Sequence, residues 1–301
     1  MVPDATPVSY YGRPVLKEPV WRWPIAAYFF TGGVAAGSSL LAFGAELTGD
    51  HRLARQSRLV SATAVAASGG LLVHDLGRPG RLLNMLRVVK PTSPMSMGTW
   101  LLSLFGSAAG LAAAADQLDR CPRAGRVADT VAAMAAPVLG TYTAVLVADT
   151  AVPVWHGARR ELPYLFASGA AAGAGAIATM LPAGRAPAAR RMAIAGGLAE
   201  LVTGRWMEAG LGPLAAPYHE GVAGRCQRAA TALTATGVAV MVGSGSGRGS
   251  RRPGRRRGNV AGAAMVAAGA LLERYAVIEA GRQSARDPAF TVGPQRARLE
   301  Q

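Results

Sequence analysis

Charged residues are scarce in this chain of 301 residues. Asp, Glu, Lys and Arg together make up 16% of it, against roughly 25% in typical soluble domains. Half of the residues are hydrophobic, and they gather in runs of about 15 to 24 residues, close to the ~20 that a helix needs to cross a bilayer. The composition therefore excludes an ordinary soluble domain and predicts an all-α, polytopic bundle of transmembrane helices.

Cysteine and histidine are too few, and too widely spaced, to build a metal centre. Cys121 and Cys226 form neither a CxxC pair nor a Cys/His cluster, whereas a structural zinc site or an iron–sulfur cluster needs about four ligands. A b-type haem needs axial ligands inside the bundle. The four histidines lie at span ends or in loops: His51, His74, His156 and His219. We therefore expect no haem, iron–sulfur cluster or other metal in this chain, so any redox role requires a partner that carries the metal centres.

Acidic residues are also few, 17 against 32 Lys and Arg, which gives a net charge of +15. Clusters of arginine attract the phosphates of nucleic acids. Here, however, the arginines lie between apolar runs, where they fix membrane orientation and meet anionic lipid headgroups. We expect membrane lipid, and no nucleic acid, as a partner. The loops after odd-numbered spans hold more Lys and Arg, mainly because of segment 247–258, so both termini are predicted on the outer face.

Eight apolar segments predict about eight spans. Their expected bounds are 23–46, 56–73, 98–115, 127–148, 162–181, 191–207, 229–243 and 260–280. The transmembrane domain would then cover 23–280, with extramembrane segments at 1–22 and 281–301. Glycines four residues apart, as at Gly33 and Gly37, let helix backbones approach closely in lipid. The pattern predicts a compact bundle.

The stretch HDLGRPGR, residues 74–81, concentrates charge at the end of the second expected span. His74 and Asp75 end the span, and Arg78 lies in the turn that follows. A quinone site needs an apolar slot with a few polar groups for the carbonyls, and a proton donor or acceptor at the headgroup. These residues fit that description. An ordinary interfacial ion pair between Asp75 and Arg78 is the alternative.

The loop after the fourth expected span should lie on the same face and add residues to this rim. It contains Trp155 and His156, and Tyr142 lies about two helical turns inside that end of the span. We therefore predict a quinone site made from both loops.

Two acidic residues, Glu200 and Glu273, fall inside apolar segments, and Glu46 ends the first. An ionised carboxylate in hydrocarbon costs at least ~2.5 kcal/mol, so such residues are usually paired or functional. Two interpretations remain open: an interhelical ion pair between Arg274 and Glu200, or a proton path that includes Glu46, Glu200, Glu273 and Arg274. Asp129 is expected close to the inner interface, with no special role.

The chain resembles the NrfD/polysulfide-reductase membrane-anchor family in three stretches, HDLGRPGRLLNMLRVVKPTSPMSMGTW, GTYTAVLVADTAVPVWHGARRELPYLFASGAAAGAGA and SARDPAFTVGPQR. The likeness extends through WPIAAYFFTGGVAAGSSLLAFGAEL and so covers most of the chain. The resemblance implies a haem-free bundle of eight helices. It also implies electron exchange between a membrane quinone, menaquinone or ubiquinone, and a ferredoxin-like iron–sulfur subunit, which serves a molybdopterin catalytic subunit.

On the matching stretches, the resemblance favours His74 and Asp75 as a proton relay and Tyr142 as a carbonyl contact. Arg78, Trp155 and His156 would complete the quinone site. The segment WRWPIAAYFF lacks the His or Asn that some relatives place early in the first span. Two other functions remain open: a transporter, which predicts inverted repeats and broken helices, and a passive anchor for a catalytic partner.

Overall fold

The computed structural model describes residues 14–78, 80–182, 187–245 and 253–293. Pro79 of the HDLGRPGR stretch and much of segment 247–258 lie outside these ranges, as do both ends of the chain. The described residues contain eight long helices and no strand, which confirms the predicted all-α class. The long helices are α1 (Trp23–Leu47), α2 (His51–Leu76), α4 (Pro94–Gln117), α5 (Pro122–Ala148), α7 (Leu162–Met180), α8 (Pro187–Leu211), α9 (Gly221–Gly245) and α10 (Pro253–Arg286). The short ones are α3 (Gly80–Leu86), α6 (Pro153–Gly157) and the 3₁₀ helix η1 (Gly212–Tyr218).

Proline marks where most of the long helices begin. α4, α5, α8 and α10 begin at a proline, and α1 and α7 begin one residue before one. Proline suits the first turn, because its fixed φ is helical and its missing N–H would have no partner there. α2 begins differently: Asp50 caps it by accepting a hydrogen bond from the Leu53 N–H at 3.1 Å.

Six long helices are long and apolar enough to cross a membrane: α1, α2, α4, α5, α7 and α10. α8 and α9 lie where the sixth and seventh spans were expected but do not reach this apolarity. Glu200, Arg205 and Glu208 lower it in α8, and threonine and glycine lower it in α9. The predicted count of about eight spans is therefore not confirmed, although eight long helices stand at the predicted positions.

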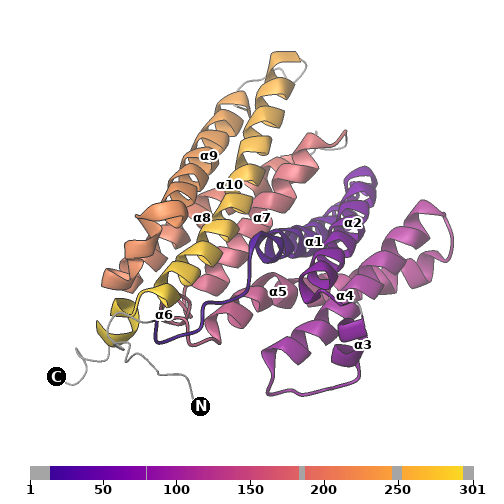
Figure 1. Ribbon diagram of the computed structural model, residues 1–301. Helices are drawn as coiled ribbons and strands as arrows, with labels where there is room; N and C mark the ends of the chain where they lie inside the picture. Colours follow the sequence, from indigo (N-terminus) through magenta and orange to yellow (C-terminus); the bar gives the residue numbers. More distant parts are fainter. Residues whose placement is uncertain (1–13, 79, 183–186, 246–252, 294–301) are drawn as a thin grey trace, which may run out of the picture.

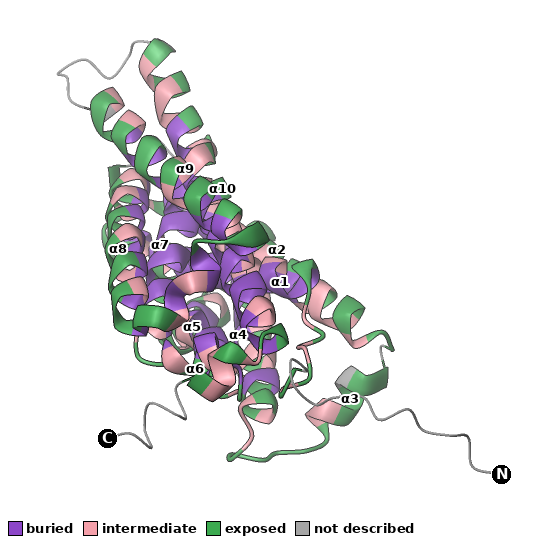
Figure 2. Cartoon of the chain, turned by 60° about the vertical axis from the view of Figure 1, so that its left-hand side comes forward, coloured by how far each residue is buried: buried purple, intermediate pink, exposed green. Residues whose placement is uncertain are grey.

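The long helices form one bundle in which α1 and α7 are central. α1 packs against α2, α5 and α7, while α7 also packs against α8 and α10. α8, α9 and α10 lie on one side of the molecule and α2, α3 and α4 on the other (Figure 1). Buried residues concentrate in the middle of α1, α7 and α10, and exposed residues cover the outer faces (Figure 2).

Small residues bring α1 and α7 together, as the glycine spacing predicts. A Cβ on Gly37 would lie 2.7 Å from both the Ala170 carbonyl oxygen and the Ala174 methyl group. Gly33 faces Ala170 in the same way, at 3.2 Å. By contrast, Gly110 on α4 faces open space, so glycine spacing alone does not locate a helix contact.

Successive long helices alternate in direction, so the bundle has two ends. We use "the α3 end" for the one that carries α3, the start of α1 and the end of α10, and "the opposite end" for the other (Figure 1). Side chains that are apolar yet exposed, such as Leu104, Met134 and Val202, cover the sides between these ends. Such an apolar belt is expected of helices that face lipid.

Candidate functional site

An apolar pocket of about 310 Å³ lies at the α3 end, between α1, α2, α4 and α5. Its volume is in the range of small-molecule sites. Aliphatic side chains, aromatic rings and two methionines form most of the lining. The polar groups in the lining come from Tyr28, Asp75, Arg81, Thr99 and Tyr142. An apolar slot with a few polar groups is typical of a site for a small organic molecule.

The HDLGRPGR stretch turns the chain at this pocket. Gly77 has φ +68°, and its N–H donates to the His74 carbonyl oxygen at 3.2 Å, which ends α2. This left-handed conformation suits glycine because it lacks a Cβ. The Arg81 guanidinium then donates to the Leu76 carbonyl oxygen at 2.9 Å and ties α3 back to α2. The turn thus brings Asp75 and Arg81 to the same pocket.

Tyr142 reaches the pocket because Gly98 on α4 has no side chain. Any Cβ on Gly98 would collide with the Tyr142 ring. The Tyr142 hydroxyl donates a hydrogen bond to the Pro94 carbonyl oxygen in the first turn of α4. Tyr142 therefore contacts both ends of the stretch PMSMG, residues 94–98: its hydroxyl binds Pro94 and its ring packs on Gly98.

His74 and Arg78 are exposed at the rim and do not line the pocket. The centroid of the His74 ring lies 6.4 Å from that of Trp23. Asp75 and Arg78, both in the described part of the chain, form no ion pair there, and Asp75 lines the pocket instead. Of the three candidates in the HDLGRPGR stretch, Asp75 is the one that faces the cavity.

Trp155 and His156 lie away from this pocket. Trp155 is 1% exposed, and its indole N–H donates to the Val277 carbonyl oxygen of α10 at 2.7 Å. His156 is exposed, with Nδ1 3.2 Å from the Ala148 carbonyl oxygen. Trp155 lines a second apolar cavity of about 290 Å³, beneath the segment before α1. The two predicted loops therefore contribute to different cavities.

Trp21 connects these two cavities. Its ring stacks on Trp155 with centroids 5.4 Å apart, and it lines both spaces. Residues 16–21, which we call the strap, cover the second cavity and end at Trp21. The Glu18 carboxylate holds the strap to α10 through Arg282 and Arg286, each at 2.6 Å. The hydrogen bond from Arg286 leads the effects that lower the pKa of Glu18 to about 2, and it acts with Arg282 against partial burial.

Comparison with known sequences identifies the group of proteins to which this architecture belongs. A family profile described as polysulphide reductase, NrfD, matches residues 14–210, about two thirds of the chain. The chain belongs to this family. Among curated proteins, it is similar to Protein NrfD of Escherichia coli (strain K12), with 37% identity over 92 residues. That alignment covers 29% of this chain and 29% of the relative.

In this NrfD-family chain, the matched region includes one candidate site completely and the other only in part. Residues 14–210 contain the strap and the whole lining of the Asp75 pocket. They also contain Glu200 but not Glu273 or Arg274. Together with the apolar helices, family membership makes the chain a multi-pass membrane protein.

The four residues of the predicted proton path separate into two clusters. Glu200, Glu273 and Arg274 meet between α8 and α10, where each is at most 4% exposed. Arg274 pairs with its neighbour Glu273 and not with Glu200, the partner in one of the two interpretations that the sequence left open. Glu46 lies at the opposite end of the bundle, with Arg58. A path through all four residues would therefore have to join two separate groups.

The cluster around Arg58 joins four helices at the opposite end. Its guanidinium lies 2.9 Å from Glu46 on α1 and 2.9 Å from Asp129 on α5. It also lies 3.5 Å from Asp116 on α4. Asp129, which the sequence left without a role, is 5% exposed and belongs to this network. The Arg58 cluster links the helix ends through charge.

Sequence reasoning missed two aromatic residues of the pocket, Trp21 and Tyr28, and gave no role to Arg81 although it lies in the charged stretch. Tyr28 shares a face of α1 with Ile25 and Phe29, and all three line the pocket. The three- and four-residue spacing of a helix face was the available signal. Histidine and asparagine, the polar quinone ligands expected in this segment, do not point to a tyrosine.

Proposed function

We propose that this chain is the quinone-reactive membrane subunit of a multi-subunit oxidoreductase. The observation that carries the proposal is the apolar pocket at one end of the bundle, with Asp75, Arg81 and Tyr142 in its lining. Membership of the NrfD family supports it, because the family name denotes a polysulphide reductase. The substrate would be menaquinone or ubiquinone, with its ring in the pocket.

The lining has the groups that quinone chemistry requires. Oxidation of a quinol releases two electrons and two protons, and reduction of a quinone takes up the same number. Asp75 would accept a proton from one ring oxygen as a carboxylate, or donate a proton to it as a carboxylic acid. A positioned acid or base contributes typically 10²- to 10⁴-fold to a rate. Arg81 would donate a hydrogen bond to one ring oxygen. Tyr142, whose hydroxyl proton points to the Pro94 carbonyl oxygen, would either turn that proton to a quinone oxygen or accept a hydrogen bond from a quinol hydroxyl. His74, exposed beside Asp75, would pass protons between the carboxylate and water.

The electrons would leave this chain for a partner. Cys121 caps the start of α5 and Cys226 lies within α9, so the two cysteines share no cluster. We propose a ferredoxin-like iron–sulfur subunit docked at the α3 end, and a molybdopterin catalytic subunit beyond it. The positive-inside rule would place this end, with both termini, on the outer face.

Quinone turnover by the assembled complex tests the proposal. Asp75→Asn should lower turnover of a soluble quinone analogue by about 100-fold, since it removes the proton acceptor. Tyr142→Phe should lower it by about tenfold, through the loss of one hydrogen bond. Asp149→Asn and Tyr164→Phe are matched controls, because both side chains are exposed and lie outside the pocket.

Assembly must be measured in the same samples, by co-purification of the partner subunits. Wild-type turnover in both pocket variants, with assembly intact, would remove the quinone site from this pocket. A wild-type complex that binds no quinone analogue would instead make the chain a passive anchor.

A further inference from the structure

A second polar site, which quinone binding does not use, lies between α8, α9 and α10. Its charged members are Glu200 on α8 and Glu273 and Arg274 on α10. Glu200 and Glu273 are each 4% exposed and Arg274 is 2% exposed. Glu200 lies 11 residues before the end of α8, which puts it about 16 Å below the α3 end.

The charges in this group do not balance if both carboxylates are ionised. Arg274 donates to Glu273 and to the carbonyl oxygens of Phe166, at 2.9 Å, and Leu165, at 3.4 Å. Both Glu200 oxygens and the Oε1 atom of Glu273 lack a hydrogen-bond partner among the described residues. Two carboxylates with one guanidinium would leave a net negative charge in an apolar interior, which is costly.

Gly169 on α7 makes room for the group. A Cβ there would collide with Nη2 of Arg274 and Oε1 of Glu200, so both atoms lie against the same glycine. The Arg274 guanidinium is therefore close to Glu200 as well as paired with Glu273, and its charge bears on both carboxylates.

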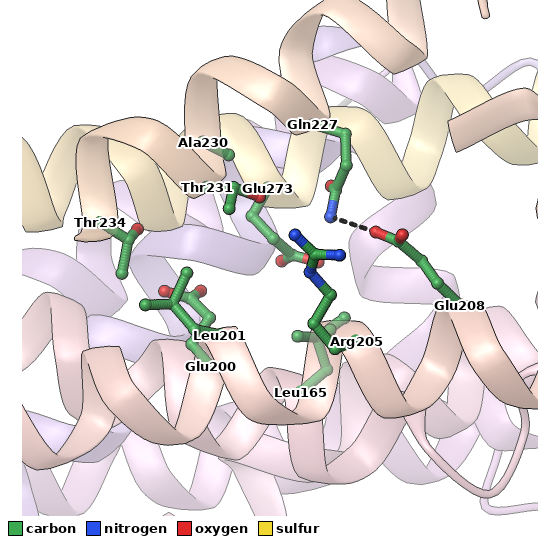
Figure 3. Close-up of a pocket in the computed structure, with 11 residues that line it drawn as sticks. Leu165, Glu200, Leu201, Arg205, Glu208, Gln227, Ala230, Thr231, Thr234 and Glu273 are labelled. Carbon is green, nitrogen blue, oxygen red and sulfur yellow. Dashed lines mark hydrogen bonds between the residues drawn. The ribbon is translucent and has the colours of Figure 1, made fainter. Parts of the chain in front are cut away.

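A small polar cleft leads from the two carboxylates toward the α3 end. It is lined by Glu200, Glu273, Arg205, Glu208, Gln227 and Thr231, among others. Figure 3 shows the side chains of α8 and α9 pointing toward one another across it. Gln227 donates to Glu208 at 3.1 Å, and Glu208 lies 3.9 Å from the exposed His219 ring.

The buried hydroxyl of Tyr218 adds a further polar atom beside this route. It is 1% exposed and lacks a partner among the described residues. Burial, together with the charges of Glu273 and Glu208, raises the pKa of Tyr218 far above its usual value. The tyrosine thus stays protonated and does not compete as a base. The charged groups around the buried carboxylates are therefore Arg274, Arg205 and Glu208.

A proton fits this site better than a metal cation does. The free volume in the cleft is about 20 Å³, which is room for one water molecule. A sodium ion would need several oxygen ligands, and here it would stand beside the Arg274 guanidinium. A proton on one carboxylate removes the surplus charge without additional volume.

This site is separated from the Asp75 pocket by two aromatic rings. The Phe166 ring lies 4.0 Å from the Arg274 guanidinium carbon, and its centroid is 5.6 Å from that of Phe29. Phe29 lines the Asp75 pocket. Benzene rings carry no exchangeable proton, so the direct line between the two sites does not conduct protons.

We propose that Glu200 and Glu273 share one exchangeable proton, which enters and leaves from the α3 end through the cleft lined by Glu208 and Gln227. The proton moves from water onto a carboxylate oxygen and back, with no oxidation or reduction. The site is distinct from any quinone pocket, and its proton would be present in the isolated chain.

Infrared spectroscopy of the full chain in lipid nanodiscs, without quinone or partners, tests this proposal. At neutral pH, the wild-type chain should show the C=O stretching band of a protonated carboxyl group, which shifts in D₂O and disappears in alkali. The band should be absent or displaced in Glu200→Gln and in Glu273→Gln. Glu220→Gln, an exposed glutamate at the same end, is the control and should leave the band intact.

The route has its own test. Glu208→Gln should slow the exchange of this band into D₂O by several-fold without removing it. An exchange rate equal to that of wild type would place the route elsewhere.

Three results would overturn the shared proton: no protonated-carboxyl band in the wild-type chain, a band unchanged in both glutamine variants, or removal of the band by sodium ions at constant pH. The last would assign the site to a metal cation. If one glutamine variant does not fold, the other variant and the pH titration of the wild-type band still test whether the two glutamates share a proton. A failure here would leave the quinone proposal untouched, because no quinone is present.

Discussion

Two arginines of this bundle, Arg58 and Arg274, each lie beside several carboxylates, and they differ in how many of these carboxylates they bind. Arg58, at the opposite end, has three carboxylates within 3.5 Å, and both Glu46 and Asp129 accept its hydrogen bonds at 2.9 Å. Arg274, in the interior, pairs with Glu273 but leaves both oxygens of Glu200 without a partner among the described residues.

The difference separates a structural network from a site able to change its protonation. Around Arg58, the ends of α1 and α4 meet the beginnings of α2 and α5, and water is close: the Glu46 side chain is 33% exposed and that of Asp116 is 26% exposed. Surplus negative charge is tolerated there, since solvent screens it. Around Arg274 both carboxylates are almost fully buried, and in our proposal a shared proton compensates the surplus charge. Substitutions in the two clusters should therefore lower the free energy of unfolding by different amounts.

The largest effect is expected from Arg58→Ala. It leaves Asp129, which is 5% exposed, as a buried charge without its partner, and breaking such a pair costs about 3–5 kcal/mol. Reversible unfolding of the chain in detergent would measure the loss. Arg55→Ala is the control: Arg55 is 44% exposed and 3.6 Å from Asp119, and exposed pairs contribute about 0–1 kcal/mol. Equal losses in both variants would show that the Arg58 network adds nothing beyond surface pairing.

The second prediction exchanges a carboxylate for its neutral isostere in each cluster. Asp129→Asn removes the charge that Arg58 binds and should cost about 1–3 kcal/mol of unfolding free energy. Glu200→Gln should cost less than ~1 kcal/mol, because a carboxyl group that already shares a proton is replaced by a neutral amide of similar shape. The same unfolding measurement compares them. If Glu200→Gln proved the costlier change, the two clusters would not differ as described.

The third prediction concerns the Asp75 pocket, where an uncharged contact sets the geometry. Gly98→Ala should force the Tyr142 ring away from α4, because the new methyl group occupies its place. A lost or misplaced hydrogen bond is worth about 1 kcal/mol, so the KM for a quinone analogue should rise by about fivefold with less change in kcat. Gly110→Ala lies on the same helix and faces open space. It should leave the KM at the wild-type value, and any equal rise there would mean that α4 as a whole had shifted.

Most of the fold could be predicted from the sequence because its signals are local. Long apolar runs predicted eight segments, and eight long helices stand close to those positions. Asp50 and Gly77 mark the two ends of α2. The number of membrane-spanning helices was harder to predict. α8 and α9 combine the length of a span with polar residues that face α10 and the cleft, and a sequence does not reveal which face is covered.

The candidate site was predictable only where its parts are close in the chain or on a shared rim. Asp75 and Tyr142 were expected to meet and do line one pocket. Trp155 and His156 were assigned to the same rim, but Trp155 turns inward to the Val277 carbonyl group and packs on Gly281 of α10. Such a contact, across more than 100 residues, leaves no periodic signal.

The smallest effect is expected at the strap, whose anchor is a half-exposed ion pair. The pKa of Glu18 lies near 2 in the folded chain, against an ordinary value of 4.5. Because the pKa is lowered in the folded chain, the ion pair of Glu18 contributes its full share of the folding stability above about pH 4.5. This share is lost as the pH falls toward 2. Because the side chain is 37% exposed, solvent screening should limit the contribution to below ~1 kcal/mol.

Hydrogen–deuterium exchange of residues 16–21 should therefore be faster in Glu18→Gln than in wild type at neutral pH, and the two exchange rates should converge in acid or at high salt. Glu220→Gln is the matched control, and a difference between Glu18→Gln and wild type that persists in acid would show that another contact, such as the stacking of Trp21 on Trp155, holds the strap.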